Sequence, residues 1–126
     1  MTNGLGDHLR GRRVLIVEDD YFVAADLAEA LQELGAIVLG PSGSVKDALR
    51  QISSDGAPDA AVLDINLGQE KAYPIADALL ARRIPFIFTT GYSGDALPVQ
   101  YGKIPRCQKP VQMAAVARLL VQGLSA

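Results

Sequence analysis

The segment VLIVEDD, residues 14–20, decides the fold, because four consecutive apolar residues run directly into three consecutive carboxylates. A continuous apolar run, as opposed to an alternating one, is typical of a strand covered on both faces, as in parallel sheets. Similar runs follow at residues 36–39, 60–63 and 86–88, and a weaker one lies at 104–108. The chain therefore contains five candidate strands.

Apolar residues with a period of 3.6 predict helices between these strands. The predicted helices cover Val23–Leu34, which Gly35 ends, Val45–Ile52, which Ser44 caps, Ile75–Leu79 and Met113–Leu120. The stretch 91–105 holds three glycines and two prolines, so any helix there is expected to be short or irregular.

Strands that alternate with helices predict an α/β fold with right-handed crossovers. Five such units fit a flavodoxin-like (βα)5 fold, a doubly wound parallel sheet with strand order 2-1-3-4-5. The length of 126 residues suits one domain, residues 1–126, and 49% hydrophobic residues can fill its core. Residues 1–11 are expected to form a flexible N-terminal extension.

Composition argues against several classes of function. The net charge is −2, without the basic excess of a nucleic-acid-binding protein. No apolar segment is long enough to cross a membrane and none resembles a secretory signal, so a cytoplasmic protein is expected. Cys107 is the single cysteine and His8 the single histidine, which argues against an internal disulfide, a His-rich metal site and a Ser-His-Asp triad.

Polar residues follow the predicted strands at the edge where such sheets carry their sites. Glu18 and Asp19 follow the first strand, Asp64 the third, Thr90 the fourth and Lys109 the fifth. Each has an ordinary structural explanation taken alone, such as a helix start, a cap, a loop hydroxyl or a surface lysine. Their joint occurrence at strand ends predicts that they converge on one pocket.

Carboxylates brought together repel each other unless a cation offsets their charge. Mg²⁺ prefers oxygen ligands and keeps several waters, and Mn²⁺ is a possible substitute. We expect Asp19 and Asp64 to be direct ligands, the backbone carbonyl of Asn66 to be a third, and Glu18 to act through water.

Asp64 is also a candidate nucleophile toward phosphorus, which would produce an aspartyl phosphate. Such a transfer depends on positioning and on neutralisation of charge. Lys109 would hold one phosphoryl oxygen, the Thr90 hydroxyl would donate to another, and Gly91 would let a backbone N–H approach closely.

These segments resemble the receiver domains of response regulators in two-component signalling, over about residues 12–123. The resemblance rests on VLIVEDD at 14–20, AVLDINL at 61–67, FTTG at 88–91 and QKP at 108–110. It implies that Asp64 is the phosphoacceptor, Glu18 and Asp19 the acidic metal pair, Thr90 the switch hydroxyl and Lys109 the phosphate-binding lysine. It also implies a cis Lys109–Pro110 bond.

The resemblance further implies partners and a mode of action. The phosphoryl donor would be a phosphohistidine on a sensor histidine kinase or a histidine phosphotransfer protein, and the domain would catalyse only its own phosphorylation and dephosphorylation. A stand-alone domain would signal by altered binding to a downstream protein, with a phosphorylation-linked homodimer as a further possibility.

The chain departs from the family pattern at the switch position. Arg106 stands where the family often has Tyr or Phe, three residues before Lys109. Arg106 could point outward as a recognition residue, or Tyr92 or Tyr101 could take the aromatic role. The loop at 67–71 reads LGQEK in place of the common Pro-Gly turn.

Three alternatives stay open. A phosphatase with Asp64 as its nucleophile would need an acid/base where Asn66 stands. A nucleotide- or flavin-binding module would need a glycine-rich loop where Glu18-Asp19-Asp20 stands. A receiver-like module that binds partners without phosphorylation would not need the whole set of Asp64, Thr90 and Lys109.

Overall fold

A five-stranded parallel sheet forms the centre of the molecule. The computed structural model describes residues 8–91 and 97–125. The strands are β1 (Arg13–Val17), β2 (Ile37–Ser42), β3 (Ala60–Asp64), β6 (Phe86–Thr90) and β7 (Arg106–Gln108), in the order β2-β1-β3-β6-β7. This order confirms the predicted 2-1-3-4-5 arrangement of a flavodoxin-like fold.

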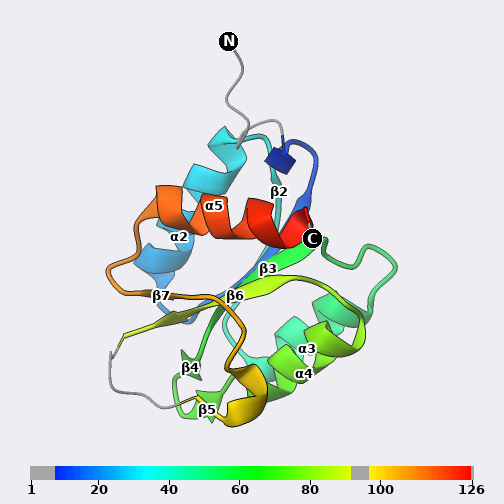
Figure 1. Cartoon of the computed structure of the whole chain (residues 1–126), viewed down its shortest axis with the longest axis vertical. Coiled ribbons are helices and arrows are strands. Elements are labelled where there is room, and N and C mark those ends of the chain that lie inside the picture. The colour runs from blue at the N-terminus through cyan, green and yellow to red at the C-terminus, as the bar shows by residue number, and fades with distance from the viewer. Residues whose placement is uncertain (1–7, 92–96, 126) are drawn as a thin grey trace.

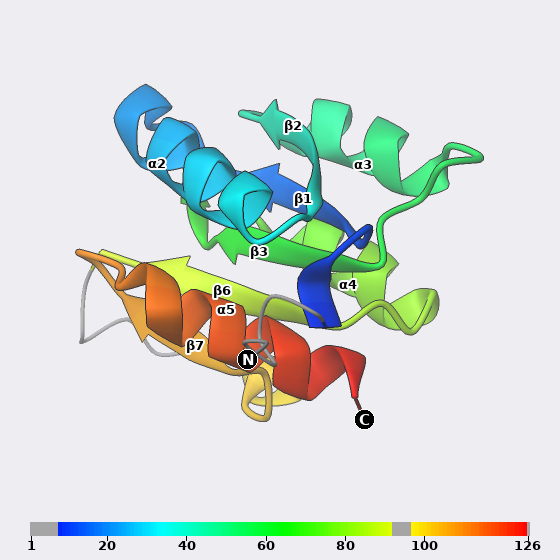
Figure 2. The same ribbon diagram turned by 90° about the horizontal axis from the view of Figure 1, so that it is seen from above.

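Within residues 8–91 and 97–125, four helices cover the two faces of this sheet (Figures 1 and 2). They are α2 (Tyr21–Glu33), α3 (Val45–Ser53), α4 (Tyr73–Ala81) and α5 (Met113–Leu124). Helices α2 and α5 contribute to one hydrophobic cluster, and α3 and α4 contribute to the other. None of the helices in the described part of the chain is long and apolar enough to span a membrane.

Local signals in the sequence explain where these helices begin. Asp20 caps α2, because its side chain accepts hydrogen bonds from the backbone N–H groups of Phe22 and Val23. Ser44 caps α3 by accepting from the N–H of Asp47, at 3.2 Å. Pro74 lies in the first turn of α4, where its missing N–H costs nothing.

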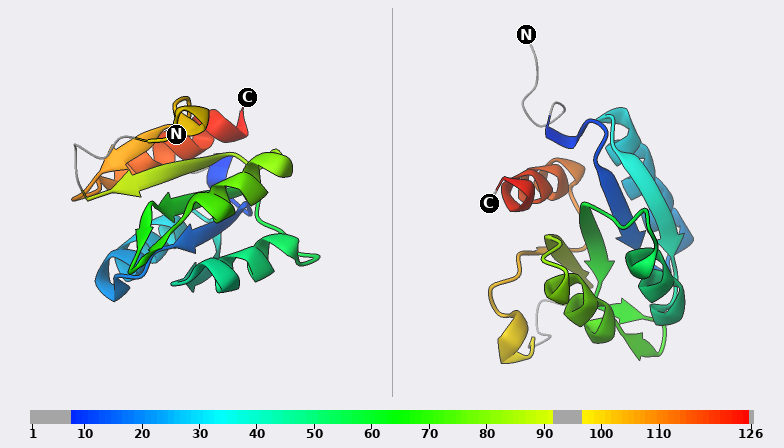
Figure 3. Two further views of the ribbon diagram at one scale, coloured as in Figure 1. Left: turned by 90° about the horizontal axis from the view of Figure 1, so that it is seen from below. Right: turned by 90° about the vertical axis from the view of Figure 1, so that its right-hand side faces the viewer.

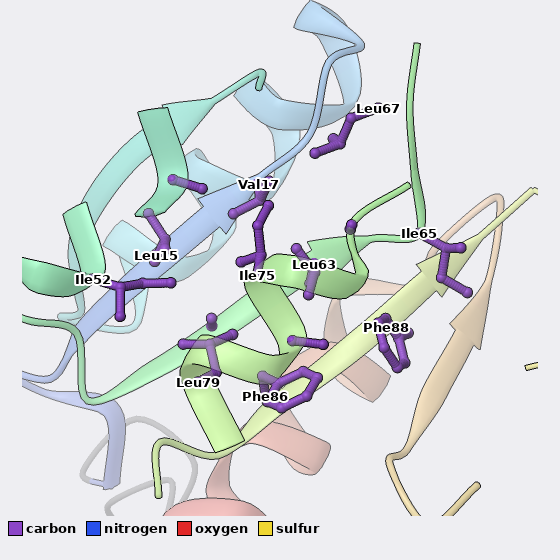
Figure 4. Packing of buried hydrophobic residues seen from close by; sticks show 14 of the residues in the cluster. Leu15, Val17, Ile52, Leu63, Ile65, Leu67, Ile75, Leu79, Phe86 and Phe88 are labelled. Carbon is purple, nitrogen blue, oxygen red and sulfur yellow. The ribbon is translucent and has the colours of Figure 1, made fainter. Parts of the chain in front are cut away.

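The continuous apolar runs are explained by burial on both faces of the sheet. Every residue of β3 and of β6 is buried. Leu15, Leu63 and Phe88 point toward α3 and α4 (Figure 4), whereas Ile16 and Val62 belong to the cluster under α2 and α5. The strands therefore have no solvent-facing side that would require alternating polar residues.

The irregular segment predicted between the last two strands is confirmed for the residues that the structure describes. In that part the helical element is one 3-10 turn, η1 (Val99–Tyr101). Tyr92, proposed as a substitute for the missing aromatic residue, lies outside the described residues.

A second, two-stranded antiparallel sheet was not expected from the sequence. Strands β4 (Asn66–Leu67) and β5 (Glu70–Lys71) pair Asn66 with Lys71 and Leu67 with Glu70. Gly68 opens their two-residue turn with φ +63°, a conformation that glycine adopts without strain. The hairpin lies beyond the carboxyl ends of the parallel strands (Figure 3).

The last residues of the expected flexible extension, residues 1–11, are packed against the fold. Leu9 is fully buried in the cluster under α2 and α5, and the N–H of Gly11 donates to the carbonyl of Gly35 at 2.8 Å. A lone leucine among polar residues has no periodicity, so the sequence carried no signal for this burial.

Candidate functional site

An open pocket with a volume of about 460 Å³ lies at the carboxyl ends of the central strands. Five predicted site residues line it: Glu18, Asp19, Asp64, Asn66 and Lys109. Asp20, Gly68 and Gly91 complete the lining. The strand order produces this convergence, because β1 and β3 are neighbours and Lys109 follows β7, which lies two strands from β3. The Lys109–Pro110 bond is cis, as the resemblance implies.

Three carboxylates meet in the pocket. Glu18, Asp19 and Asp64 each offer an oxygen, and these oxygens lie within 4.8 Å of one another. Glu18 and Asp64 are almost fully buried, and Asp19 is exposed. At this separation the side chains of Asp19 and Asp64 are close enough to share an ion, and their role as ligands stays a prediction.

Backbone groups hold the carboxylates in place. The N–H of Asp20 donates to Glu18 Oε1 at 3.0 Å, and the N–H of Asn66 donates to Asp64 Oδ1 at 3.2 Å. The N–H of Glu18 donates to the carbonyl of Ser42 at 2.9 Å, which fixes the exit of β1 against β2. The acidic side chains are thus positioned by the ends of the strands that carry them.

Lys109 bridges two of the carboxylates. Its Nζ donates to Asp64 Oδ2 at 2.9 Å and to Glu18 Oε1 at 3.2 Å. Partial burial lowers the pKa of Lys109, but the hydrogen bonds to Asp64 and Glu18 outweigh it and raise the pKa above its ordinary value. Lys109 therefore stays charged and offsets part of the negative charge.

Burial controls the titration of Glu18. Its pKa is raised from 4.5 to about 7, chiefly by desolvation, although the hydrogen bonds from Asp20 and Lys109 act in the opposite direction. The neighbouring carboxylate of Asp64 contributes to this rise. Near neutral pH the pocket can therefore gain or lose one proton at Glu18.

The pocket fits a hard divalent cation. Its donors are carboxylate oxygens, which Mg²⁺ prefers. Glu18 Oε2 is buried, lies 3.0 Å from the Lys109 ammonium as an ion pair, and accepts no hydrogen bond from the described residues. An oxygen of this kind can accept a hydrogen bond from a metal-bound water, as expected for Glu18.

Thr90 is close to the pocket but does not line it. It is the last residue of β6 and is 3% exposed. Its carbonyl accepts a hydrogen bond from the N–H of Lys109 at 2.7 Å, so the backbones of Thr90 and Lys109 are joined. The glycine after it, Gly91, does line the pocket.

Arg106 and Tyr101 occupy different environments. Arg106 is exposed on the edge strand β7, beside Phe88 of β6. Tyr101 is buried, stacks on Tyr73 with ring centroids 5.1 Å apart, and donates from its hydroxyl to Asp77 Oδ1 at 2.6 Å. Arg106 is exposed, as the first of the two sequence-based alternatives requires, and its role as a recognition residue stays a prediction.

Sequence reasoning missed Gly68 as a pocket residue. A Cβ atom at Gly68 would lie 3.7 Å from Asp19 Oδ2, so the turn of the hairpin rests against the acidic pair. The available signal was a glycine four residues after Asp64, but glycines occur in many turns, and only the hairpin places this one.

Comparisons with known proteins agree with this geometry. The solution structure of SdrG from Sphingomonas melonis is 41% identical, covers 92% of this chain and 98% of that chain, and has a TM-score of 0.79. A second structure of SdrG, in a BeF3-activated conformation, has a TM-score of 0.74 over 90% of this chain and 96% of that one. The signal receiver domain of a modulated diguanylate cyclase from Desulfovibrio desulfuricans is 30% identical over 91% of this chain and 94% of that chain, with a TM-score of 0.75.

A curated relative extends beyond the matching region. The phyllosphere-induced regulator PhyR of Methylorubrum extorquens is 30% identical over 117 residues, which cover 88% of this chain and 43% of PhyR. The chain spans about two fifths of the length of the curated relatives it matches. No protein-family model matches the chain.

The parallel sheet, the acidic pocket and these similarities define a signalling domain. The chain belongs to the receiver domains of response regulators.

Proposed function

We propose that this receiver domain accepts a phosphoryl group onto Asp64 from a phosphohistidine, in a Mg²⁺-dependent reaction. The donor would be a sensor histidine kinase or a histidine phosphotransfer protein. The observation that carries the proposal is the convergence of the Asp64 carboxylate with two further carboxylates and the Lys109 ammonium. The cytoplasm is the proposed location, and the single cysteine, Cys107, fits a compartment without disulfides.

The chemistry assigns a task to each side chain. A carboxylate oxygen of Asp64 attacks phosphorus, the P–N bond to the histidine breaks, and the imidazole leaves with the electron pair and takes a proton from solvent. Lys109, already 2.9 Å from Asp64, would pair with a phosphoryl oxygen. The Thr90 hydroxyl and the N–H of Gly91 are proposed donors to the same group.

The metal site is proposed from the same geometry. Asp19 and Asp64 would hold Mg²⁺, or Mn²⁺ in its place, with the backbone carbonyl of Asn66 as a third ligand and Glu18 acting through water. The bound cation would neutralise charge on the phosphoryl group during transfer.

Output would be a change in protein binding. Phosphorylation adds negative charge and strong hydrogen-bond acceptors beside Lys109, so the contacts of this lysine with Asp64 and Glu18 must rearrange. Because the backbone N–H of Lys109 is hydrogen-bonded to the carbonyl of Thr90, the rearrangement can reach β6 and β7. A downstream protein, or a second copy of the chain, would detect the altered surface.

Mass spectrometry tests the reaction. After treatment with acetyl phosphate and Mg²⁺, the wild-type chain is expected to gain one phosphoryl group that Asp64→Asn does not gain. Lys109→Ala is expected to bind Mg²⁺ but to lose the response of its partner. A wild-type chain that stays unmodified, also with a phosphorylated kinase as donor, would favour the alternative of a binding module that works without phosphorylation.

A further inference from the structure

The β4–β5 hairpin brings a second lysine, Lys71, into contact with a residue that lines the acidic pocket. Asn66 and Lys71 are directly opposite residues of the hairpin, and Lys71 Nζ donates a hydrogen bond to Asn66 Oδ1. Lys71 is exposed, whereas Asn66 is half-buried and lines the pocket. The pair therefore connects the surface of the hairpin to the interior of the site.

Both ends of the hairpin are attached to the rest of the fold. Leu67 is buried in the cluster under α3 and α4, and the N–H of Ala72 donates to the carbonyl of Ile65 at 2.9 Å. Glu70 Oε2 accepts from the N–H of Val45, the first residue of α3, at 3.4 Å. The backbone that carries Asn66 and Lys71 is thus held in place, which keeps the two residues opposite each other beside the pocket.

The chemistry of lysine determines which end of the Asn66 amide it contacts. An ammonium group has three donors and no acceptor, so it must face the amide oxygen and not the NH2 group. Lys71 occupies one of the two acceptor sites of this oxygen, so the opposite end of the amide, its NH2 group, is directed away from Lys71 and available to an occupant of the pocket. Donors of this kind suit an anion.

We propose that Lys71 is a positioning residue that orients Asn66 so that its amide NH2 donates to an oxygen of the phosphoryl group on Asp64. This inference rests on the proposed function. It separates two roles of Asn66, because the backbone carbonyl is assigned to the cation and the side chain to the anion. A hydrogen bond to a charged oxygen is stronger than one between neutral groups, so a correctly oriented amide contributes measurably to anion binding.

Binding of beryllofluoride in the presence of Mg²⁺, measured by isothermal titration calorimetry, tests this role, because beryllofluoride is an anionic mimic of the phosphoryl group. Lys71→Met removes the donor and is expected to weaken beryllofluoride binding about tenfold. Lys71→Arg keeps a donor and is expected to restore affinity to near the wild-type value. Lys103→Met is the matched control, since Lys103 is exposed and precedes β7 at the opposite end of the sheet.

A double-mutant cycle separates positioning from simple charge attraction. If Lys71 acts through the amide, Asn66→Ala weakens binding about as much as Lys71→Met, and the double variant is no weaker than either single variant. Asn66→Asp keeps an acceptor for Lys71 but has no NH2 group, so it is also expected to bind beryllofluoride poorly. Equal affinity of Lys71→Met and wild type, or full additivity in the cycle, would overturn the proposal.

The same measurements distinguish this inference from the proposed function. A wild-type chain that neither binds beryllofluoride with Mg²⁺ nor becomes phosphorylated would overturn both. A wild-type chain that does both, with variants at Lys71 that bind normally, would overturn the role of Lys71 alone.

Discussion

At the scale of single residues, the environment of Glu18 changes its chemistry. It is 3% exposed, and its burial raises its pKa to about 7. Lys109 and the N–H of Asp20 offset part of the cost of burying its charge. Glu18 therefore binds a proton more tightly in the folded chain than in the unfolded one, where its pKa is near 4.5.

This difference predicts a pH dependence of stability. A carboxyl group whose pKa is raised by folding stabilises the fold at pH values below 4.5, and this contribution is lost as the pH rises through about 7. Without divalent cations, the free energy of unfolding of the wild type is therefore expected to fall, relative to that of Glu18→Gln, between pH 5 and pH 8. Urea unfolding in the presence of EDTA at several pH values measures both free energies of unfolding. A wild-type value that stays constant or rises relative to that of Glu18→Gln would contradict the prediction.

At the scale of elements, the segment from residue 97 to residue 105 is attached to the fold through the side chain of Tyr101. Pro98, Gly102 and Pro105 prevent a regular helix. Tyr101 attaches the segment to α4 through its stacking on Tyr73 and its hydrogen bond to Asp77. Its ring also meets Phe88 of β6 edge-on, with centroids 6.0 Å apart.

Two substitutions at Tyr101 separate its contacts. Tyr101→Phe loses the hydroxyl, with its hydrogen bond to the exposed carboxylate of Asp77 and its longer one to the carbonyl of Tyr73, which is expected to cost about 1 kcal/mol of unfolding free energy. Tyr101→Ala also loses the ring, and a loss of about 3–5 kcal/mol is expected for an aromatic residue in a core. Thermal and urea unfolding measure both values. Similar losses in the two variants would show that the ring contributes little.

At the scale of the whole molecule, the sheet separates two hydrophobic clusters, and its central strands contribute side chains to both. The pocket lies at the carboxyl ends of these strands. Leu63 is fully buried under α3 and α4, and the next residue is Asp64. The packing that stabilises the fold therefore also sets the position of the Asp64 carboxylate, the proposed nucleophile.

A cavity in this core is expected to lower stability strongly. Leu63→Ala should reduce the free energy of unfolding by about 2–5 kcal/mol, because it removes buried methyl groups and leaves a cavity. Val99→Ala is the control, since Val99 is 94% exposed and its truncation is expected to change stability by less than about 0.5 kcal/mol. Urea unfolding of both variants tests the comparison, and equal losses would mean that the core has been misassigned.

The sequence by itself determined the parts of this protein that depend on local patterns. Apolar runs such as residues 14–17 and 60–63 predicted strands that are buried on both faces of the sheet. The order of strands and helices then limited the topology to a few possibilities. That topology places strand ends together, which is why Asp19, Asp64 and Lys109 could be assigned to one pocket in advance.

Only the tertiary structure decided the features that depend on contacts between segments without a pattern of their own. Strands of two residues are too short to show alternation, so the hairpin and the Asn66–Lys71 contact had no sequence signal. Leu9 and Tyr101 are single apolar side chains in polar or Gly- and Pro-rich surroundings, and their burial depends on the surfaces available nearby. The spacing of apolar residues predicts the environment of a whole helix or strand. The position of an isolated side chain depends instead on the neighbours that folding brings to it.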